Sequence, residues 1–211
     1  MKYEWKKADK ELYLPKNKPV LVTVPAFNFF MMEGKGDPSS ESFSEQVGLL
    51  YSLAYSVKMM PKKGITPEGY YEFSVFPLEG IWDLVEEAKV KETLDKDDFK
   101  YTIMIRQPDF VTERLAQDVL AGVKEKKPHP FLDRVRFGQL EEGLCLQMLH
   151  IGPYDEEFKS FSLMEDYCRK HNFRRKTKIH REIYLSDPRR TQPDKLKTVL
   201  RFKVENSLSS D

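Results

Sequence analysis

A short segment near the C-terminal end of the chain, HREIYLSD, places a carboxylate between an imidazole and a phenol. Side chains alternate between the two faces of a β-strand, so a strand here would put His180, Glu182 and Tyr184 on one face. Loss of solvation among aromatic groups raises the pKa of a carboxyl group, which favours general base or general acid chemistry near neutral pH. The alternative is a structural carboxylate that pairs with an arginine such as Arg181 or Arg201.

Aromatic residues elsewhere in the chain are candidates to complete such a site. The phenols of Tyr154 and Tyr184 can donate a hydrogen bond to a developing oxyanion. Trp82, Tyr71 and Phe29 offer flat surfaces on which a planar ligand can stack. Each of these five side chains can equally be a structural aromatic residue of the core, and the sequence leaves both interpretations open.

Composition and charge give no support to several classes of function, among them nucleic-acid-binding and membrane proteins. The chain has 211 residues, of which 40% are hydrophobic and 33% charged, which is typical of a globular protein of one ordinary domain or two small ones. Its 35 basic and 34 acidic residues give no electrostatic reason to expect nucleic acid or an anionic membrane as a partner. The polar start, MKYEWKKADKELYLP, has no apolar signal segment, and no apolar run approaches the ~18–20 residues of a membrane span. We therefore expect a cytoplasmic protein.

The common cofactor and nucleophile motifs are missing from the sequence. It has no P-loop, no GxGxxG and no GxSxG elbow. Cys145 and Cys168 do not form a CxxC pair, and the histidines do not have metal-ligand spacing, so buried reduced thiols are expected. We therefore expect chemistry that needs neither a cofactor nor a metal.

Periodicity predicts the elements that must position these residues. Helices are expected at 40–60, with Ser39 or Ser40 as N-cap, at 109–127 and at 155–171. Strands are expected at 19–33 (one strand or a bent pair), 69–78, 99–106, 144–150, 179–186 and 196–204. Trp82 would lie in a loop. Residues 1–18 would form a lead-in that either docks through its aromatic residues or frays, and residues 205–211 a disordered tail.

The order strand, helix, strand, strand occurs twice in this scheme. Module one spans about 19–107 and module two about 140–204, with the helix at 109–127 between them, in a single domain at 19–204. EFSVFP aligns with EIYLSD, which makes Glu72 the counterpart of Glu182. The prediction is an α+β fold: two β-α-β-β modules in pseudo-twofold duplication, forming an antiparallel sheet with a ligand groove on the face away from the helices. Chance similarity is the alternative.

Several of these segments resemble a known family. LHIGPYDEEFKSF and HREIYLSDPRR are similar to the GyrI-like small-molecule-binding domain, the drug-binding part of several multidrug-sensing regulators and of gyrase-inhibitory proteins. EGKGDP, SESFSEQVGLLYSLAYSVK and FPLEGIW resemble more specifically its stand-alone bacterial subfamily, of which some members hydrolyse cyclopropane-bearing DNA-alkylating natural products. The resemblance covers residues 19–204.

The resemblance implies roles for individual residues. Glu182 matches the strand glutamate that meets cationic or polar ligands, Tyr154 would lie at the mouth of the site, and Trp82 would be a lid. The expected function is hydrolytic ring opening of a planar aromatic compound, with Glu182 and Tyr154 as catalytic residues. The expected ligand-binding residues are Trp82, Tyr71, Tyr184, Phe29, His180 and Glu72.

Two other functions stay open. A non-catalytic protein that sequesters or senses multiple drugs would use the same groove, and an interaction protein acting on gyrase would use a surface that the sequence does not mark. For the hydrolase and for the non-catalytic binding protein, the expected partner is a small aromatic molecule, and neither nucleic acid nor a membrane is expected. The oligomeric state is not predicted.

Overall fold

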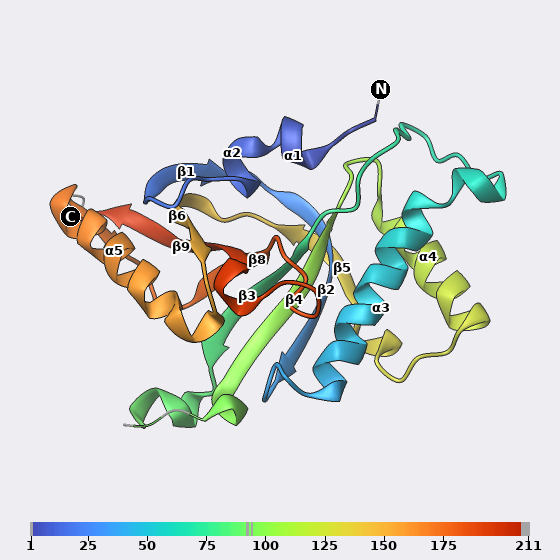
Figure 1. Ribbon diagram of the computed structural model, residues 1–211. Coiled ribbons are helices and arrows are strands. Elements are labelled where there is room, and N and C mark those ends of the chain that lie inside the picture. Colours follow the sequence, from blue (N-terminus) through green and yellow to red (C-terminus); the bar gives the residue numbers. More distant parts are fainter. Residues whose placement is uncertain (1, 92, 94, 208–211) are drawn as a thin grey trace. The chain divides into compact units, whose positions relative to one another are not determined.

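The structure is a computed structural model that describes residues 2–91, 93 and 95–207 (Figure 1). The chain divides into two compact units. The first unit comprises Met1–Trp5, Phe27–Leu78 and Leu84–Leu140. The second unit comprises Lys6–Ala26, Glu79–Asp83 and Glu141–Asp211. Both combine helices with antiparallel strands, so the α+β class expected from the sequence is confirmed.

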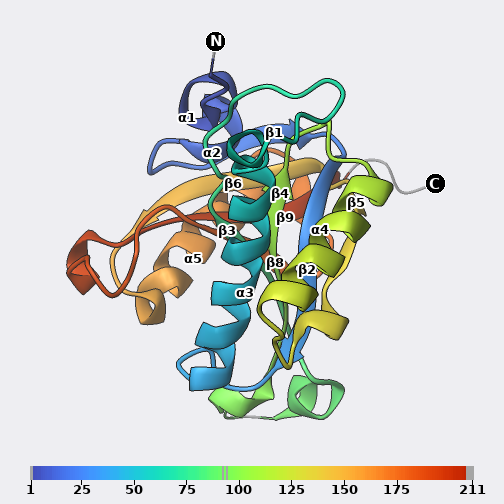
Figure 2. The same cartoon turned by 90° about the vertical axis from the view of Figure 1, so that its right-hand side faces the viewer.

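The first unit is built around strand β2 (Phe27–Lys35). This strand pairs antiparallel with β4 (Phe99–Gln107) and with β5 (Arg136–Leu140). Helices α3 (Glu41–Lys58) and α4 (Glu113–Lys126) lie side by side against these strands (Figure 2). Each helix begins at a hydroxyl N-cap, since Ser40 accepts from the backbone N–H of Phe43 and Thr112 from that of Leu115. The short 3₁₀ helices of this unit are η1 (Pro61–Lys63), η2 (Glu86–Val90), η3 (Lys96–Asp98) and η4 (Leu132–Arg134).

The second unit has the strand order β1-β6-β9-β8-β3, and β7 also pairs with β9. All of these pairs are antiparallel. The strands are β1 (Val20–Val24), β3 (Leu78–Leu84), β6 (Gly143–Ile151), β7 (Phe173–Arg175), β8 (His180–Tyr184) and β9 (Lys197–Asn206). The helices are α2 (Lys10–Tyr13), α5 (Glu157–Lys170) and the 3₁₀ helices η5 (Tyr154–Glu156) and η6 (Pro193–Lys195), while α1 (Trp5–Ala8) begins in the first unit.

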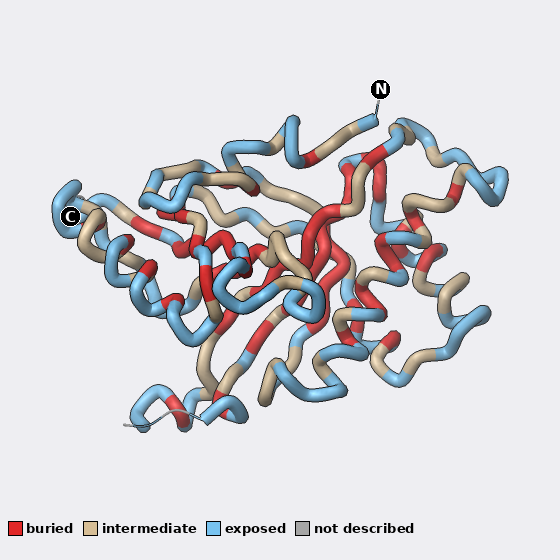
Figure 3. The backbone as a smooth tube through the Cα atoms, viewed as in Figure 1, coloured by how far each residue is buried: buried red, intermediate tan, exposed pale blue. Residues whose placement is uncertain are grey.

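Buried residues follow the strands, whereas the helices bury one side only (Figure 3). In the second unit, α5 packs on β6 and β7. The core under this helix consists of Leu146, Met148, Met164, Cys168, Leu200, Phe202 and Val204. Burial of side chains of this size, at about 1.5–3 kcal/mol each, is the main stabilising term for such a layer.

A buried polar network ties the N-terminal segment to the second unit. Arg181 contacts Glu79 at 2.7 Å and Glu142 at 3.2 Å, and Arg201 contacts Glu142 at 2.9 Å. Burial opposes ionisation of Glu142, but the two guanidinium groups outweigh it and hold the pKa of Glu142 below its ordinary value. The phenol of Tyr13 donates to Glu79 at 3.0 Å, so the lead-in is docked rather than frayed.

Most of the expected elements are confirmed, with four differences. The strand expected at 69–78 is wrong: among the described residues its β-pairing is a single isolated bridge between Phe73 and Tyr3, and Pro77 has no N–H to donate. A strand begins instead at Leu78 and carries Trp82, which is therefore not in a loop. Strands β5 and β7 were not expected. The predicted tail is wrong at its start, because β9 continues to Asn206, while 208–211 lie outside the described residues.

Candidate functional site

Strand β8 presents its alternate residues to two different environments. Arg181 and Ile183 are buried, and Arg181 joins the polar network described above. On the other face, the Nε2 atom of His180 lies 3.0 Å from Oε1 of Glu182, and the hydroxyl of Tyr184 donates to Oε2 of Glu182 at 2.7 Å. The period-2 alternation of the sequence therefore correctly placed these three side chains together.

Strand β3 supports this face of β8. Their register pairs Trp82 with His180 and Gly80 with Glu182, and the indole Nε1 of Trp82 donates to the hydroxyl of Tyr184 at 2.8 Å. A Cβ atom added at Gly80 would lie 2.7 Å from that indole nitrogen and 3.3 Å from that hydroxyl, so only glycine leaves room for the bond. Trp82 is 6% exposed and sits in a strand. Its strand position and its hydrogen bond hold the indole in place, and its role in ligand binding stays a prediction.

The sequence left open whether Glu182 is a structural partner of an arginine. Both candidate arginines have other partners: Arg181 pairs with Glu79 and Glu142, and Arg201 with Glu142 and Gln147. Glu182 is only 9% exposed and accepts instead from an imidazole and a phenol. A buried carboxylate held by such donors is oriented without being neutralised, which suits binding of a positive charge or proton transfer.

A second carboxyl group lies beside Glu182, and the sequence analysis missed it. Glu157, in the first turn of α5, is 7% exposed, and the charge of Glu182 acts on its carboxyl. Burial, followed by the charge of Glu182, raises the pKa of Glu157 well above its ordinary value. The helix N-terminus favours a negative charge by only about 0.3–1 kcal/mol, which is too little to reverse these effects. In the sequence, an acid at that place is typical of a solvated helix start, so no local signal distinguishes it.

Both tyrosines of the site keep their protons. Burial, followed by the carboxyl of Glu182, raises the pKa of Tyr184 well above its ordinary value. Burial, with the charges of Glu182 and Glu157, raises the pKa of Tyr154 to about 12. The two rings meet edge to face with centroids 6.1 Å apart, and Tyr154 is 38% exposed. Near neutral pH each phenol is therefore a hydrogen-bond donor, and that of Tyr154 is the more accessible.

His150 holds the GPY turn that carries Tyr154. Its Nδ1 lies 2.9 Å from the hydroxyl of Ser160, and its Nε2 lies 3.1 Å from the carbonyl oxygen of Pro153. Gly152, next to this turn, has φ 136°, a conformation that other residues rarely adopt. Both ring nitrogens of His150 are thus engaged in shaping the turn.

The remaining predicted ligand residues belong to the first unit. Phe29 is buried on β2, and Tyr71 packs its ring on Phe110 at 5.3 Å between centroids. Glu72 is exposed and lies outside any strand, so its expected position as a strand counterpart of Glu182 is wrong. Its carbonyl oxygen accepts from the backbone N–H of Tyr3. Roles for Phe29, Tyr71 and Glu72 in ligand binding remain predictions.

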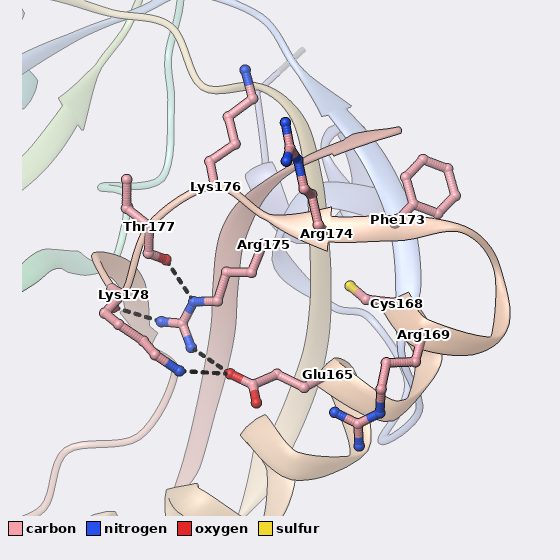
Figure 4. A pocket seen from close by; sticks show the side chains of 9 residues that line it. All are labelled: Glu165, Cys168, Arg169, Phe173, Arg174, Arg175, Lys176, Thr177 and Lys178. Atoms are coloured by element: carbon pink, nitrogen blue, oxygen red, sulfur yellow. Dashed lines mark hydrogen bonds and ion pairs between the residues drawn. The ribbon is translucent and has the colours of Figure 1, made fainter. Parts of the chain in front are cut away.

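Two cavities lie away from the Glu182 cluster. One, of about 460 Å³, is lined by Glu165, Cys168, Arg169 and residues 173–178. Arg175 and Lys178 converge there on Glu165, each at 3.3 Å (Figure 4). The other, of about 360 Å³, is lined by residues of the first unit that include Lys124 and His129. In the described part of the chain, no group of three or more His, Cys, Asp or Glu side chains is arranged to hold a metal ion.

The sequence of the chain matches the family model of the GyrI-like small-molecule-binding domain over residues 17–205. This chain belongs to the GyrI-like family. It is 39% identical to a hydrolase from Listeria innocua whose crystal structure superimposes with a TM-score of 0.89, covering 97% of this chain and 100% of that one. A second structure of a Listeria innocua hydrolase gives 38% identity and a TM-score of 0.87, with 96% and 100% covered.

A more distant structure shares the fold alone. The C-terminal domain of EcmrR is 13% identical, with a TM-score of 0.52 over 90% of this chain and 98% of that one. A comparison with curated proteins gave no match. None of the helices in the described residues is long and apolar enough to cross a membrane. Membership of the family makes the chain a small-molecule-binding protein.

Proposed function

We propose that this GyrI-like protein binds planar aromatic or lipophilic molecules at the Glu182 cluster and hydrolyses cyclopropane-bearing DNA-alkylating compounds, as a form of detoxification. The observation that carries the proposal is the Glu182 carboxyl, held by His180 and Tyr184 next to the accessible phenol of Tyr154. The relatives described as hydrolases, at 38% and 39% identity, support a hydrolytic reaction.

The proposed reaction adds one water molecule to a cyclopropane that is joined to a conjugated dienone. Glu182 takes a proton from water while the water oxygen attacks the ring CH₂ group. The C–C bond of the cyclopropane breaks, and its electron pair moves into the conjugated ring, which becomes a phenolate. Tyr154 donates a hydrogen bond to the developing oxyanion, and the proton held by Glu182 then neutralises the product. The product is a phenol with a hydroxyethyl or equivalent side chain.

The properties of Glu157 and Glu182 suit the proposed ring opening. Burial and the charge of Glu182 raise the pKa of Glu157, so Glu157 gives up its proton less readily than an ordinary carboxyl group. His180 and Tyr184 orient that acceptor from both of its oxygens. A positioned base of this kind contributes typically 10²–10⁴-fold to a rate.

Mass spectrometry of a spirocyclopropyl dienone after incubation tests the reaction. We expect a gain of one water with the wild type and a loss of turnover of about 10²–10⁴-fold in Glu182→Gln, with ligand binding retained. Circular dichroism checks that the variant folds. Equal turnover in the variant and the wild type would contradict the role of Glu182.

A binding protein without turnover is the second candidate. The carboxyl of Glu182 lies among the rings of Trp82, Tyr184 and Tyr154, which is the combination that recognises aromatic cations by charge and stacking. In that case the incubated compound is recovered with unchanged mass, although quenching of tryptophan fluorescence reports its binding.

A further inference from the structure

The segment 169–178, RKHNFRRKTK, concentrates positive charge in a chain whose total charge is nearly balanced. It contains six of the 35 basic residues and no acid. It forms the end of α5, the strand β7 and the loop that leads to β8, and it supplies most of the residues that line the cavity of about 460 Å³. We propose that this surface binds an extended acidic segment of a partner protein, which adds to β7 as a further strand. The inference is independent of the proposed function, because Glu182 and its partners do not line this cavity.

Strand β7 leaves one of its two edges without a neighbouring strand. Successive residues of a strand direct their N–H and C=O groups to opposite edges. Lys176 donates its backbone N–H to β9, and the carbonyl oxygen of Asn172 accepts from the residue after β9. Arg174, midway between them, therefore also faces β9. The backbone groups of Phe173 and Arg175 point to the opposite edge, where no strand pairs with β7 among the described residues.

The strand that covers β8 does not extend to β7. Both β7 and β8 lie on the same side of β9, because the carbonyl oxygens of Lys203 and Lys197, an even number of residues apart, accept from the residues that follow β7 and β8. On the other edge of β8, the pairing with β3 runs from Glu79 to Trp82 and ends opposite His180. The open edge of β7 thus continues the line of β3.

An extended peptide matches this edge better than a small anion does. The edge offers carbonyl oxygens as well as N–H groups, and a peptide strand pairs with both, which is the source of affinity in strand addition. Phosphate or sulfate has several acceptor oxygens but few or no donors, so it would leave the carbonyl oxygens of the edge unpaired. The main-chain groups therefore favour a peptide.

Arg175 organises the basic side chains on one face of β7. Its side chain is 12% exposed, and its guanidinium donates to the carbonyl oxygens of Thr177 at 2.8 Å and Lys178 at 2.6 Å. It also lies 4.4 Å from the ring centroid of Phe202. These contacts hold the loop after β7 beside the strand. The side chains of Arg175 and Lys178 both contact Glu165, each at 3.3 Å, which is longer than the roughly 2.7–2.9 Å of a strong charge-assisted bond.

The other face of β7 carries a second group of cations, whose side chains point away from Glu165 in Figure 4. Arg174 and Lys176 both contact Glu205, at 2.7 and 3.6 Å. At the end of α5, Arg169 pairs with Asp166. In the ion pairs of the described residues, the five basic side chains that line the cavity thus share three carboxylates, which leaves two positive charges in excess. A peptide strand directs successive side chains to opposite faces, so neighbouring acidic residues reach both groups of cations.

Charges on an edge strand also protect it from unwanted pairing. Basic side chains discourage the addition of ordinary strands, a second copy of a basic strand included. The same charges attract an acidic strand, and specificity arises from this difference. The side chains of Lys176 and Lys178 are 47% and 87% exposed, so exchanging their present partners for a peptide carboxylate costs little. The charge pattern of the edge therefore selects an acidic partner.

Fluorescence anisotropy with three peptides tests the proposal. The probe is a short fluorescein-labelled peptide in which two glutamates alternate with one valine, so that glutamates fall on both faces. One comparison peptide has glutamine in place of every glutamate. The other has methyl groups on its backbone nitrogens, which removes the main-chain donors at constant charge. We expect saturable binding of the probe at low ionic strength, and a loss of about tenfold or more for either comparison peptide.

Substitutions in the protein locate the site. The double variant Lys176→Gln, Lys178→Gln should bind the acidic peptide about tenfold more weakly. Glu165→Gln should bind it about two- to fivefold more tightly, because the substitution releases Arg175 and Lys178 from a competing carboxylate. Lys170→Gln is the matched control and should behave as the wild type, since Lys170 lies in the same segment but does not line the cavity. Circular dichroism checks that each variant folds.

Each of the contrary outcomes overturns the proposal. Absence of binding by the acidic peptide removes the partner class. Equal binding of the N-methylated peptide indicates an anion site without strand addition. An equal loss in Lys170→Gln indicates a diffuse positive field instead of a site at β7. Tighter binding of a short DNA duplex than of the peptide, lost in the double variant, assigns the surface to nucleic acid.

Discussion

The indole of Trp82 on β3 donates a hydrogen bond of 2.8 Å to the hydroxyl of Tyr184 on β8. That hydroxyl donates in turn to Glu182 at 2.7 Å. The indole thus fixes the direction in which the phenol hydrogen points, because an oxygen that accepts from one side donates to the other. The adjacent strands β3 and β8 thereby orient the carboxylate of Glu182 through two polar atoms, the indole nitrogen of Trp82 and the hydroxyl oxygen of Tyr184.

Gly80 is the position on which this relay depends. In Gly80→Ala the new methyl group would approach the indole nitrogen of Trp82 to 2.7 Å, which is closer than carbon and nitrogen atoms tolerate. We expect a loss of unfolding free energy of about 1–3 kcal/mol, since overpacking of this kind forces neighbouring side chains from their rotamers. Denaturant unfolding measures it, and binding of the spirocyclopropyl dienone should weaken as well.

Gly122→Ala is the matched control for that substitution. Gly122 lies in α4, and a Cβ atom there would meet nothing within 4 Å. Alanine is the better helix former, so this variant should gain up to about 1 kcal/mol. Equal effects of the two substitutions would show that the space at Gly80 has no special importance.

Tyr154→Phe tests the proposed oxyanion donor. The variant loses only a hydroxyl from a ring that is partly exposed, so the fold should be unaffected. We expect kcat for ring opening to fall by about 10- to 100-fold with little change in KM, less than for a fully buried donor because solvent competes. Unchanged kcat would remove Tyr154 from the mechanism.

The pH profile of the wild type checks the protonation state of that donor. Since the pKa of Tyr154 is raised to about 12, its phenol stays protonated throughout the neutral and mildly alkaline range. Between pH 7 and 10 we therefore expect the kcat of the wild type and that of Tyr154→Phe to depend on pH in the same way. Stopped-flow or discontinuous assays can follow kcat over this range.

Glu142→Gln tests the buried network on the opposite face of β8. The substitution leaves Arg181 and Arg201 buried without their shared carboxylate, so we expect a loss of about 3–5 kcal/mol at neutral pH. The folded-state pKa of Glu142 is depressed, so its contribution is present above its ordinary pKa of 4.5 and is lost as pH falls through the folded-state value. The gap between variant and wild type, measured by denaturant unfolding, should narrow in acid.

An exposed ion pair provides the comparison for that network. Glu205 contacts Arg174 at 2.7 Å, with more than a third of each side chain exposed. Glu205→Gln should cost under about 1 kcal/mol, because solvent screens such pairs. A similar loss for both glutamine variants would mean that burial does not strengthen the Glu142 contacts.

Local sequence patterns were sufficient to predict several helices and strands, the shared face of one strand and the family. The alternation of HREIYLSD was sufficient to place His180, Glu182 and Tyr184 on one face, because the side-chain period of a strand depends on the backbone alone. Helical spacing located α3 and α5 for the same reason. The resemblance of the GPY and late-strand segments correctly indicated the GyrI-like family.

Tertiary structure decided which groups those side chains meet. The alternation of residues 69–78 predicted a strand, but a strand also needs a paired neighbour, and the pairing found in the described residues is one isolated bridge to Tyr3. The charge of Glu182 on β8 acts on Glu157 at the start of α5, and the bond of Trp82 to Tyr184 joins residues 102 positions apart. Burial and proximity shift the pKa of a carboxyl group, and both come from packing between elements, which no local pattern encodes.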